Sequence, residues 1–259
     1  AWFGHTRRDL KMDIIYPEYM TRKYPCIVWI CGGAWAAMDR SAHLAYLAKL
    51  ARSGFVVASV EYRTTNEGTF PMQLMDVKAG IRYLKAHSER YHIDAERFGV
   101  MGESAGGYLT AMAALVDDKA YDVGAFTEYS SKVQAACPWY PPTDVTSFPY
   151  PSPELAAAAP ESLLLGKNVA SHQEEAMKIC PVTYVKKDAP TFLIIHGDQD
   201  HTVPFGQGEL LHDRLEEAGV DVKLLVLEGA DHADVRFFQE EIWQRITAFF
   251  QDKLINSKE

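Results

Sequence analysis

The stretch that decides the fold is Phe98-Gly99-Val100-Met101-Gly102-Glu103-Ser104-Ala105-Gly106-Gly107. A short apolar run ends in Gly-Glu-Ser-Ala-Gly-Gly, and an alanine-rich segment of helical character follows over residues 108–115. A G-x-S-x-G pattern between a strand and a helix predicts a sharp turn that holds the Ser104 hydroxyl at the carboxyl end of a sheet. Gly102 and Gly106 are expected to leave room for this turn, because a Cβ at either position would collide with a neighbouring element. The alternative is a glycine-rich turn with an incidental serine.

Apolar runs and helical patterns alternate on both sides of this turn. Strands are expected at residues 10–16, 24–30, 55–60, 98–101, 133–139, 191–196 and 222–227. Helices are expected from about residue 41 to residue 53 and at residues 71–87, 108–115, 206–218 and 233–254. Most of the strands are continuous apolar runs, which is typical of strands that are buried on both faces. The alternation therefore predicts an α/β fold with a mainly parallel central sheet and helices on both faces.

Residues 143–180 interrupt this alternation. They contain several prolines, an alanine run at residues 156–159 and short helical pieces. Segments of this length without regular structure are uncommon inside compact domains and often cover or form a site. We therefore expect a small cap or lid over the edge of the sheet, inserted into a single α/β domain of residues 1–259.

The composition fits one large domain and argues against several classes of partner. The chain has 259 residues, of which 47% are apolar, and a formal net charge of −9. Without a basic excess, neither a nucleic acid nor an anionic membrane surface is expected as a partner. No run approaches about 18 apolar residues, so no transmembrane helix is expected. Residues 1–8 lack the features of a signal peptide, which favours a cytoplasmic location and leaves secretion open if a leader was removed.

The four cysteines do not indicate a metal or redox site. None of Cys26, Cys31, Cys137 and Cys180 belongs to a C-x-x-C pair. Cys26 and Cys31 flank one predicted strand and would lie about 16 Å apart, which is too far for a disulfide. Reduced thiols and no bound metal are therefore expected.

Polar residues and flexible turns follow several of the predicted strands. They are Gly32-Gly33-Ala34, Ser104, Asp198 and Asp200, and Asp231-His232. Because the carboxyl ends of parallel strands lie at one edge of a sheet, where ligands bind, we expect these groups to meet. Acyl transfer by a serine requires a nucleophile, a base, an orienting acid and backbone donors. That chemistry needs no metal and no organic cofactor.

His232 is the expected base, because a polar turn after the last strand lets its imidazole reach Ser104 without disturbing the sheet. His201 lies beside the predicted acid and is the main rival, whereas His196 at a strand end is expected to be structural. The remaining histidines are expected on helix surfaces (His43, His87, His172 and His212) or in loops (His5 and His92).

Asp200 is preferred over Asp198 as the acid that orients the base. Asp198 lies nearer to the turn and is expected to cap backbone N–H groups, whereas Asp200 is better placed to reach a neighbouring loop. Asp231 is expected to be a turn residue, because the side chains of adjacent residues diverge.

Backbone donors for a developing oxyanion are expected on both sides of Ser104. The Ala105 amide lies at the start of the following helix, where N–H groups are free. A second donor is expected from Gly33 or Ala34, because glycine allows a backbone to approach closely.

Aromatic residues near the strand ends have two interpretations. Trp35 and Tyr140 lie just past strand ends and are expected as walls of the substrate pocket. Trp139 and Phe148 are expected in the core. Glu103 is expected to bond the neighbouring backbone, with its side chain pointing away from the pocket.

On these residues, the sequence resembles the α/β-hydrolase superfamily, in particular bacterial esterases of the hormone-sensitive lipase group and Bacteroidetes-type feruloyl and acetyl esterases. The matching segments span nearly the whole chain and are Cys31–Trp35, Glu61–Arg63, Gly102–Gly107, His196–Asp200 with Val203-Pro204, and Asp231-His232. The order Ser104, Asp200, His232 matches the Ser…Asp…His order of the superfamily. The resemblance implies a carboxylic-ester hydrolase with an acyl-serine intermediate, the acid at Asp200 and no cofactor. Its implied partner is a small-molecule ester, with an acetylated or feruloylated saccharide as one candidate.

One residue departs from the family pattern. The family usually has a histidine before the two glycines of the donor loop, and Cys31 replaces it here. A thiol makes a weaker hydrogen bond than an imidazole, so the donor loop is expected to be anchored differently. A second interpretation makes Cys31 a reactive thiol.

Two other functions stay open on the sequence. The first is a serine peptidase of the prolyl-oligopeptidase type, which uses the same three residues. The second is a non-catalytic binding protein on a hydrolase scaffold, which the intact Ser104, Asp200 and His232 argue against.

Overall fold

The computed structural model describes residues 9–256, so the expectations for His5 and for residues 1–8 lie outside it. Within that range, seven strands form one sheet in the order β1-β3-β2-β4-β5-β6-β7. Their bounds are β1 (Met12–Ile15), β2 (Tyr24–Ile30), β3 (Val56–Val60), β4 (Ile93–Glu103), β5 (Ala135–Trp139), β6 (Thr191–Gly197) and β7 (Val222–Leu227). β1 runs antiparallel to β3 and all other neighbours are parallel, which confirms the predicted mainly parallel sheet.

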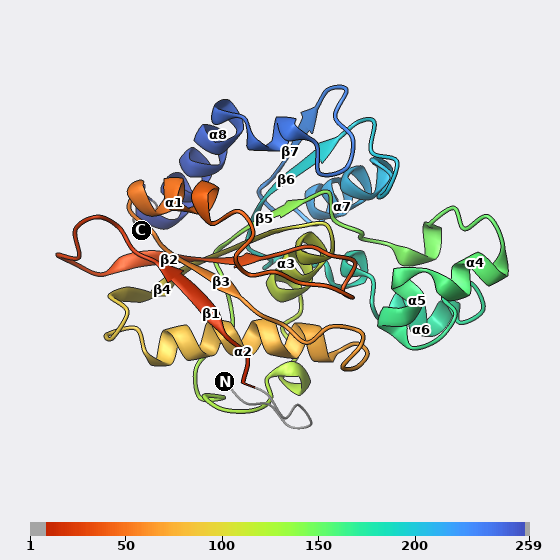
Figure 1. Cartoon of the computed structure of the whole chain (residues 1–259), viewed down its shortest axis with the longest axis horizontal. Coiled ribbons are helices and arrows are strands. Elements are labelled where there is room, and N and C mark those ends of the chain that lie inside the picture. Colours follow the sequence, from red (N-terminus) through yellow and green to blue (C-terminus); the bar gives the residue numbers. More distant parts are fainter. Residues whose placement is uncertain (1–8, 257–259) are drawn as a thin grey trace.

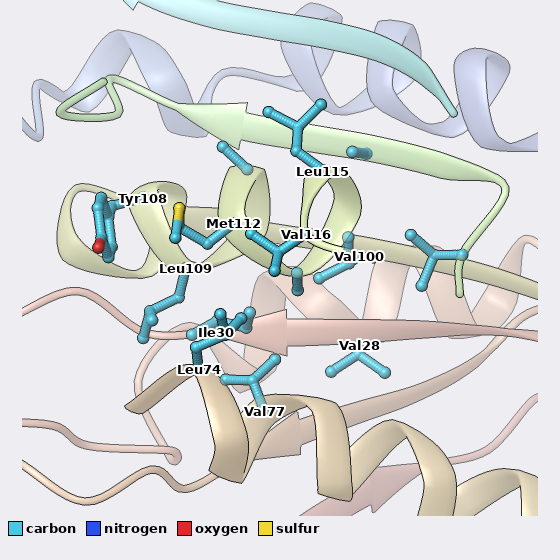
Figure 2. Packing of buried hydrophobic residues seen from close by; sticks show 14 of the residues in the cluster. Val28, Ile30, Leu74, Val77, Val100, Tyr108, Leu109, Met112, Leu115 and Val116 are labelled. Carbon is cyan, nitrogen blue, oxygen red and sulfur yellow. The ribbon is translucent and has the colours of Figure 1, made fainter. Parts of the chain in front are cut away.

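Helices cover both faces of this sheet (Figure 1). The longer ones are α1 (Leu44–Arg52), α2 (Met72–Ala86), α3 (Ala105–Leu115), α7 (Gly206–Glu217) and α8 (Glu240–Gln251). The core has two layers, because the side chains of each strand alternate between the two faces. On β2, Val28 and Ile30 pack in the layer under α2 and α3 (Figure 2), while Ile27 and Trp29 pack in the layer under α1 and α8. Among the described residues, no helix combines the length and the apolar character that crossing a membrane requires.

The last predicted helix, residues 233–254, is wrong as one continuous element. The structure has a 3₁₀ turn η4 (Val235–Phe238), then α8, then a π-helical turn η5 (Asp252–Asn256). Gln239, between the first two, is extended with φ −69° and ψ 150°, so the helix starts again after it. Val235, which lies within the predicted helix, is 69% exposed.

Residues 143–180, called the cap below, consist of short helices joined by loops beside the sheet (Figure 1). They are η2 (Val145–Ser147), α4 (Pro153–Ala158), α5 (Pro160–Leu165) and α6 (Gln173–Met177). α4 and α5 each begin with a proline, whose missing N–H has no partner in the first turn of a helix. Gln207 of α7 fastens the base of the cap, because its side-chain oxygen accepts hydrogen bonds from the Thr143 amide at 2.8 Å and the Asp144 amide at 2.7 Å.

Candidate active site

Ser104 occupies a strained turn at the centre of the sheet. It lies between the end of β4 and the start of α3 with φ 52° and ψ −120°, and its amide donates to the Trp139 carbonyl at 3.0 Å. A Cβ added to Gly106 would lie 2.0 Å from the Ile30 carbonyl oxygen, and one added to Gly102 would lie 2.4 Å from the same atom. Both glycines are therefore required for this close approach, as the sequence predicts.

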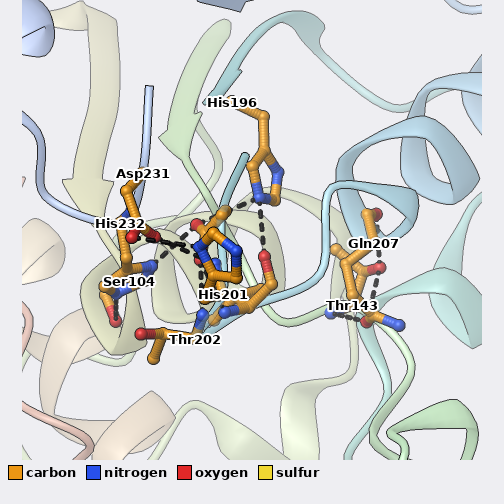
Figure 3. Close-up of polar contacts among 10 residues, drawn as sticks. Ser104, Thr143, His196, His201, Thr202, Gln207, Asp231 and His232 are labelled. Atoms are coloured by element: carbon orange, nitrogen blue, oxygen red, sulfur yellow. Dashed lines mark hydrogen bonds and ion pairs between the residues drawn. The ribbon is translucent and has the colours of Figure 1, made fainter. Parts of the chain in front are cut away.

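Ser104, His232 and Asp200 form one chain of hydrogen bonds. His232 Nδ1 lies 2.8 Å from Asp200 Oδ2, and His232 Nε2 lies 2.9 Å from Ser104 Oγ (Figure 3). Because a carboxylate can only accept, Nδ1 carries the proton and Nε2 is free to accept the serine hydroxyl. The three residues follow β4, β7 and β6, so the carboxyl edge of the sheet brings them together.

The Asp200 carboxylate is held on both of its oxygens. Oδ1 accepts from the Thr202 amide at 2.9 Å and the Val203 amide at 2.8 Å. Burial alone would raise the pKa of Asp200, but hydrogen bonds from His196 and His232, the charge of His232 and the Val203 N–H hold that pKa well below its usual range. The group therefore stays a carboxylate and keeps the His232 ring oriented.

His196 contacts the acid, which the sequence does not predict. It is fully buried, and its Nε2 lies 3.0 Å from the Val203 carbonyl and 3.3 Å from Asp200 Oδ2 (Figure 3). Both of these atoms are acceptors, so Nε2 donates. The expected structural role fits, and the structure adds the contact with Asp200. The spacing of four residues between His196 and Asp200 across a strand end is the signal that could have indicated it.

The rival acid and the rival base lie outside the hydrogen-bond chain. Asp198 Oδ1 accepts from the Gly229 amide at 2.7 Å, which is the backbone cap that the sequence predicts. His201 has a 79% exposed side chain and pairs with Asp231 at 3.1 Å. Neither residue reaches Ser104.

Asp231 connects the loops that carry Asp200 and His232. Its Oδ1 accepts from the His201 amide at 2.9 Å and from the His232 amide at 2.7 Å (Figure 3). Because His201 directly follows Asp200, one carboxylate fixes the backbone beside both residues. Asp231 is thus a turn residue, as expected, with a bridging role that the sequence does not show.

The predicted donor loop passes beside Ser104 in an unusual conformation. Gly33, Ala34 and Trp35 all have positive φ, with values of 124°, 52° and 56°. The Gly33 carbonyl accepts from the amides of the following turn, which keeps this turn closed. Ala34 and Ala105 line the same cavity as Ser104. Within residues 9–256, the amides of Ala34 and Ala105 donate to no protein acceptor, so both are available to a ligand.

Glu103 differs from its expectation, since its main partners are side chains. His43 Nε2 lies 3.0 Å from Oε1, and the Tyr140 hydroxyl donates to Oε2 at 2.7 Å. Burial opposes ionisation, but His43, the Tyr140 hydroxyl and the Gly32 N–H hold the pKa of Glu103 below its usual value. His43 was expected on a helix surface, yet it precedes α1 with φ 64° and points inward.

Cys31 is buried beside Glu103. Its Sγ lies 3.9 Å from Glu103 Oε1, and its carbonyl accepts from the Tyr62 hydroxyl at 3.0 Å. Burial raises the pKa of Cys31 to about 11. A thiol is nucleophilic only as the thiolate, so this environment argues against the interpretation of Cys31 as a reactive residue. The donor loop is anchored at this residue by the Tyr62 hydroxyl, through the Cys31 carbonyl.

A cavity of about 180 Å³ adjoins Ser104 on the side of the cap. Trp35 lines it, as predicted, and so does Phe148, which was expected in the core. Tyr140 does not line this cavity, in contrast to the expectation. Its buried ring packs edge-on against the His232 ring at 4.5 Å, because its hydroxyl is drawn toward Glu103.

No group of three metal-binding side chains is assembled within residues 9–256. All four cysteines are buried and free of disulfides. What the site offers to a ligand consists of a serine hydroxyl with a hydrogen-bonded imidazole, two free amides and a small cavity.

Comparison with known proteins identifies relatives along most of the chain. The sequence model of the BD-FAE family matches residues 12–215. Among curated proteins, the probable carboxylic ester hydrolase LipM of Mycobacterium tuberculosis is 30% identical over 222 residues, which are 79% of this chain and 51% of LipM. The chain spans about half the length of the curated relatives that it matches.

Two solved structures are similar over nearly the whole chain. A truncated carbohydrate esterase from gut microbiota is 29% identical with a TM-score of 0.88, and the alignment covers 97% of this chain and 95% of that one. A bifunctional GH43-CE protein of Bacteroides eggerthii is 29% identical with a TM-score of 0.86, over 94% of this chain and 33% of that one. These likenesses confirm the predicted α/β-hydrolase fold.

Proposed function

Because this chain belongs to the BD-FAE family of α/β-hydrolase esterases, we propose that it hydrolyses carboxylic esters through an acyl intermediate on Ser104. One observation carries the proposal. Asp200, His232 and Ser104 form a continuous hydrogen-bond chain that ends beside the amides of Ala34 and Ala105.

In the first half of the reaction, Ser104 Oγ attacks the ester carbonyl carbon while its proton passes to His232 Nε2. The carbonyl oxygen becomes an oxyanion and is bound by the amides of Ala105 and of Gly33 or Ala34, each contributing roughly 10²–10³ in rate. The carbon–oxygen bond to the alcohol then breaks, and the alcohol leaves with the proton from His232. Asp200 stabilises the His232 imidazolium throughout.

In the second half, water attacks the acyl-serine and gives its proton to the neutral His232 ring. The second tetrahedral intermediate collapses, the proton returns to Ser104 Oγ, and the carboxylic acid leaves. The Ser104 hydroxyl and the neutral His232 ring are then restored.

The cavity supports a short acyl group. Its volume of about 180 Å³ lies below the roughly 300–1,000 Å³ of pockets for drug-sized ligands. An acetyl-sized group suits this space better than a feruloyl group. One of the two similar solved structures is a truncated carbohydrate esterase from gut microbiota, which supports a saccharide as the alcohol.

The test is a substrate panel with an active-site probe. We expect hydrolysis of 4-nitrophenyl acetate to exceed that of the butyrate and of a feruloyl ester, acetate release from acetylated xylan, and covalent labelling of Ser104 by a fluorophosphonate. Absence of both labelling and hydrolysis would favour the non-catalytic scaffold. Cleavage of a peptide anilide as fast as the matched ester would favour the peptidase.

A further inference from the structure

Glu161 lines the Ser104 cavity from the cap. It lies in the first turn of α5 in the cap and is 7% exposed. It lines the same cavity as Ser104 and Ala34, and it is the one ionisable side chain among the residues that line it. Neither the hydrogen-bond chain of Ser104 nor the donor loop uses it.

The Glu161 carboxyl has few partners for a buried group. The Tyr150 hydroxyl lies 3.5 Å from Oε2, at the limit of a hydrogen bond, and its nearer acceptor is the Val145 carbonyl at 3.2 Å. Burial raises the pKa of Glu161, and the hydrogen bonds from its own backbone N–H and from the Tyr150 hydroxyl do not cancel that rise. A carboxyl group in such a place gains stability from any ligand that brings a hydrogen-bond donor.

The rest of the cavity restricts which donor fits. The aromatic rings of Trp35 and Phe148 and the side chains of Pro142 and Pro160 give it largely apolar walls. An acidic ligand would be repelled by Glu161. A compact neutral group that carries a hydroxyl on an apolar frame satisfies both features.

We propose that Glu161 is a specificity-determining residue whose carboxylate accepts a hydrogen bond from a hydroxyl group of the ester substrate. This inference rests on the proposed function, because it assigns a preference to the same site. The hydroxyl belongs either to the acyl group or to the alcohol, and the test distinguishes the two.

The experiment compares Glu161→Gln with the wild type on two pairs of esters. The acyl pair is 4-nitrophenyl glycolate and 4-nitrophenyl acetate, which differ by one hydroxyl. The alcohol pair is methyl 2-O-acetyl-xyloside and its 3,4-di-O-methyl derivative, with acetate release as the readout. We expect Glu161→Gln to lower kcat/KM about tenfold for the hydroxylated member of one pair, because a charged acceptor becomes a neutral one. The member without a hydroxyl should change little.

Two further variants separate recognition from a structural role. Glu154→Gln makes the same change in the first turn of α4, where the side chain is exposed, and should alter neither member of either pair. Tyr150→Phe removes the weak donor to Glu161 together with the hydrogen bond to the Val145 carbonyl, and it should preserve the preference for the hydroxylated ester. If Glu161 only held the cap through Tyr150, Tyr150→Phe would lower hydrolysis of both members of each pair at least as much as Glu161→Gln.

The outcomes are distinct. Loss confined to the hydroxylated member of the acyl pair or of the alcohol pair supports the inference and locates the hydroxyl. Equal loss for both members, or an unchanged ratio in both pairs, overturns it while ester hydrolysis stands. A wild type that hydrolyses none of these esters overturns the proposed function and this inference with it.

Discussion

The turn at Ser104 and the cap are built in opposite ways. The turn is fixed by backbone contacts, since Gly102 and Gly106 pass within contact distance of the Ile30 carbonyl and the Ser104 amide donates to Trp139. The cap is fastened by side chains such as Gln207 and by a backbone hydrogen bond from the Phe70 amide to the Leu164 carbonyl at 2.8 Å, and its helices have at most six residues.

This difference suggests that the turn at Ser104 fixes the proposed reaction, whereas the cap sets the substrate preference. A backbone that is held on both sides leaves one position for the nucleophile, so the chemistry is fixed by the sheet. Short helices on a few side-chain anchors tolerate changes in the residues that face the cavity. If that division holds, substitutions at the turn should remove activity or the fold, and substitutions in the cap should alter preference.

The largest effect is expected for Ser104→Ala. Without the hydroxyl no acyl-serine forms, and we expect kcat for 4-nitrophenyl acetate to fall by about 10⁵–10⁶-fold. The melting temperature should not fall, because the hydroxyl holds no part of the fold. Activity within tenfold of the wild type would contradict the proposed nucleophile.

Asp200→Asn should have the next largest effect. An amide at this position no longer favours the tautomer with a proton on His232 Nδ1, and we expect kcat to fall by about 10⁴-fold. Asp198→Asn is the matched control, because Asp198 accepts only from the Gly229 amide among residues 9–256. The reverse ranking of the two variants in steady-state kinetics would assign the acid to Asp198.

Gly106→Ala should damage the fold. Its Cβ would lie 2.0 Å from the Ile30 carbonyl oxygen, and we expect the free energy of unfolding in urea to fall by about 3 kcal/mol. Gly206→Ala is the control, since a Cβ there has no atom within 4 Å, and it should stabilise by about 0.5 kcal/mol. Equal stability of the two variants would mean that the turn is less constrained than the contacts indicate.

The elements that the sequence predicts well are those with a strong local pattern. The continuous apolar run of β2 and the glycine–serine turn after β4 indicate their structures without help from distant residues. Asp200 and His232 were also accessible to this reasoning, because polar residues after parallel strands meet at one edge.

The features that the sequence does not predict depend on contacts between distant segments. The pairing of His43 with Glu103 requires a loop that turns His43 inward through a positive φ, and no periodicity indicates that. Phe148 faces the cavity because the cap folds back toward Ser104. The break at Gln239 depends on its extended backbone, and the apolar spacing on both sides of it still reads as one helix.

The smallest effect on chemistry is expected at the base of the cap, for Gln207→Met. The change keeps the length of the side chain but leaves the Thr143 and Asp144 amides without their acceptor, which costs about 2 kcal/mol of unfolding free energy. Gln207→Glu retains an acceptor for both amides, but it loses the donor to Ser147 Oγ at 2.9 Å and buries a carboxyl group, so it should recover only part of this stability. Hydrolysis of 4-nitrophenyl acetate should change little in both variants, because neither touches the hydrogen-bond chain of Ser104. Loss of activity in Gln207→Met on the scale of Ser104→Ala, with the protein still folded by circular dichroism, would show that the cap takes part in the reaction and that the two regions are not separable.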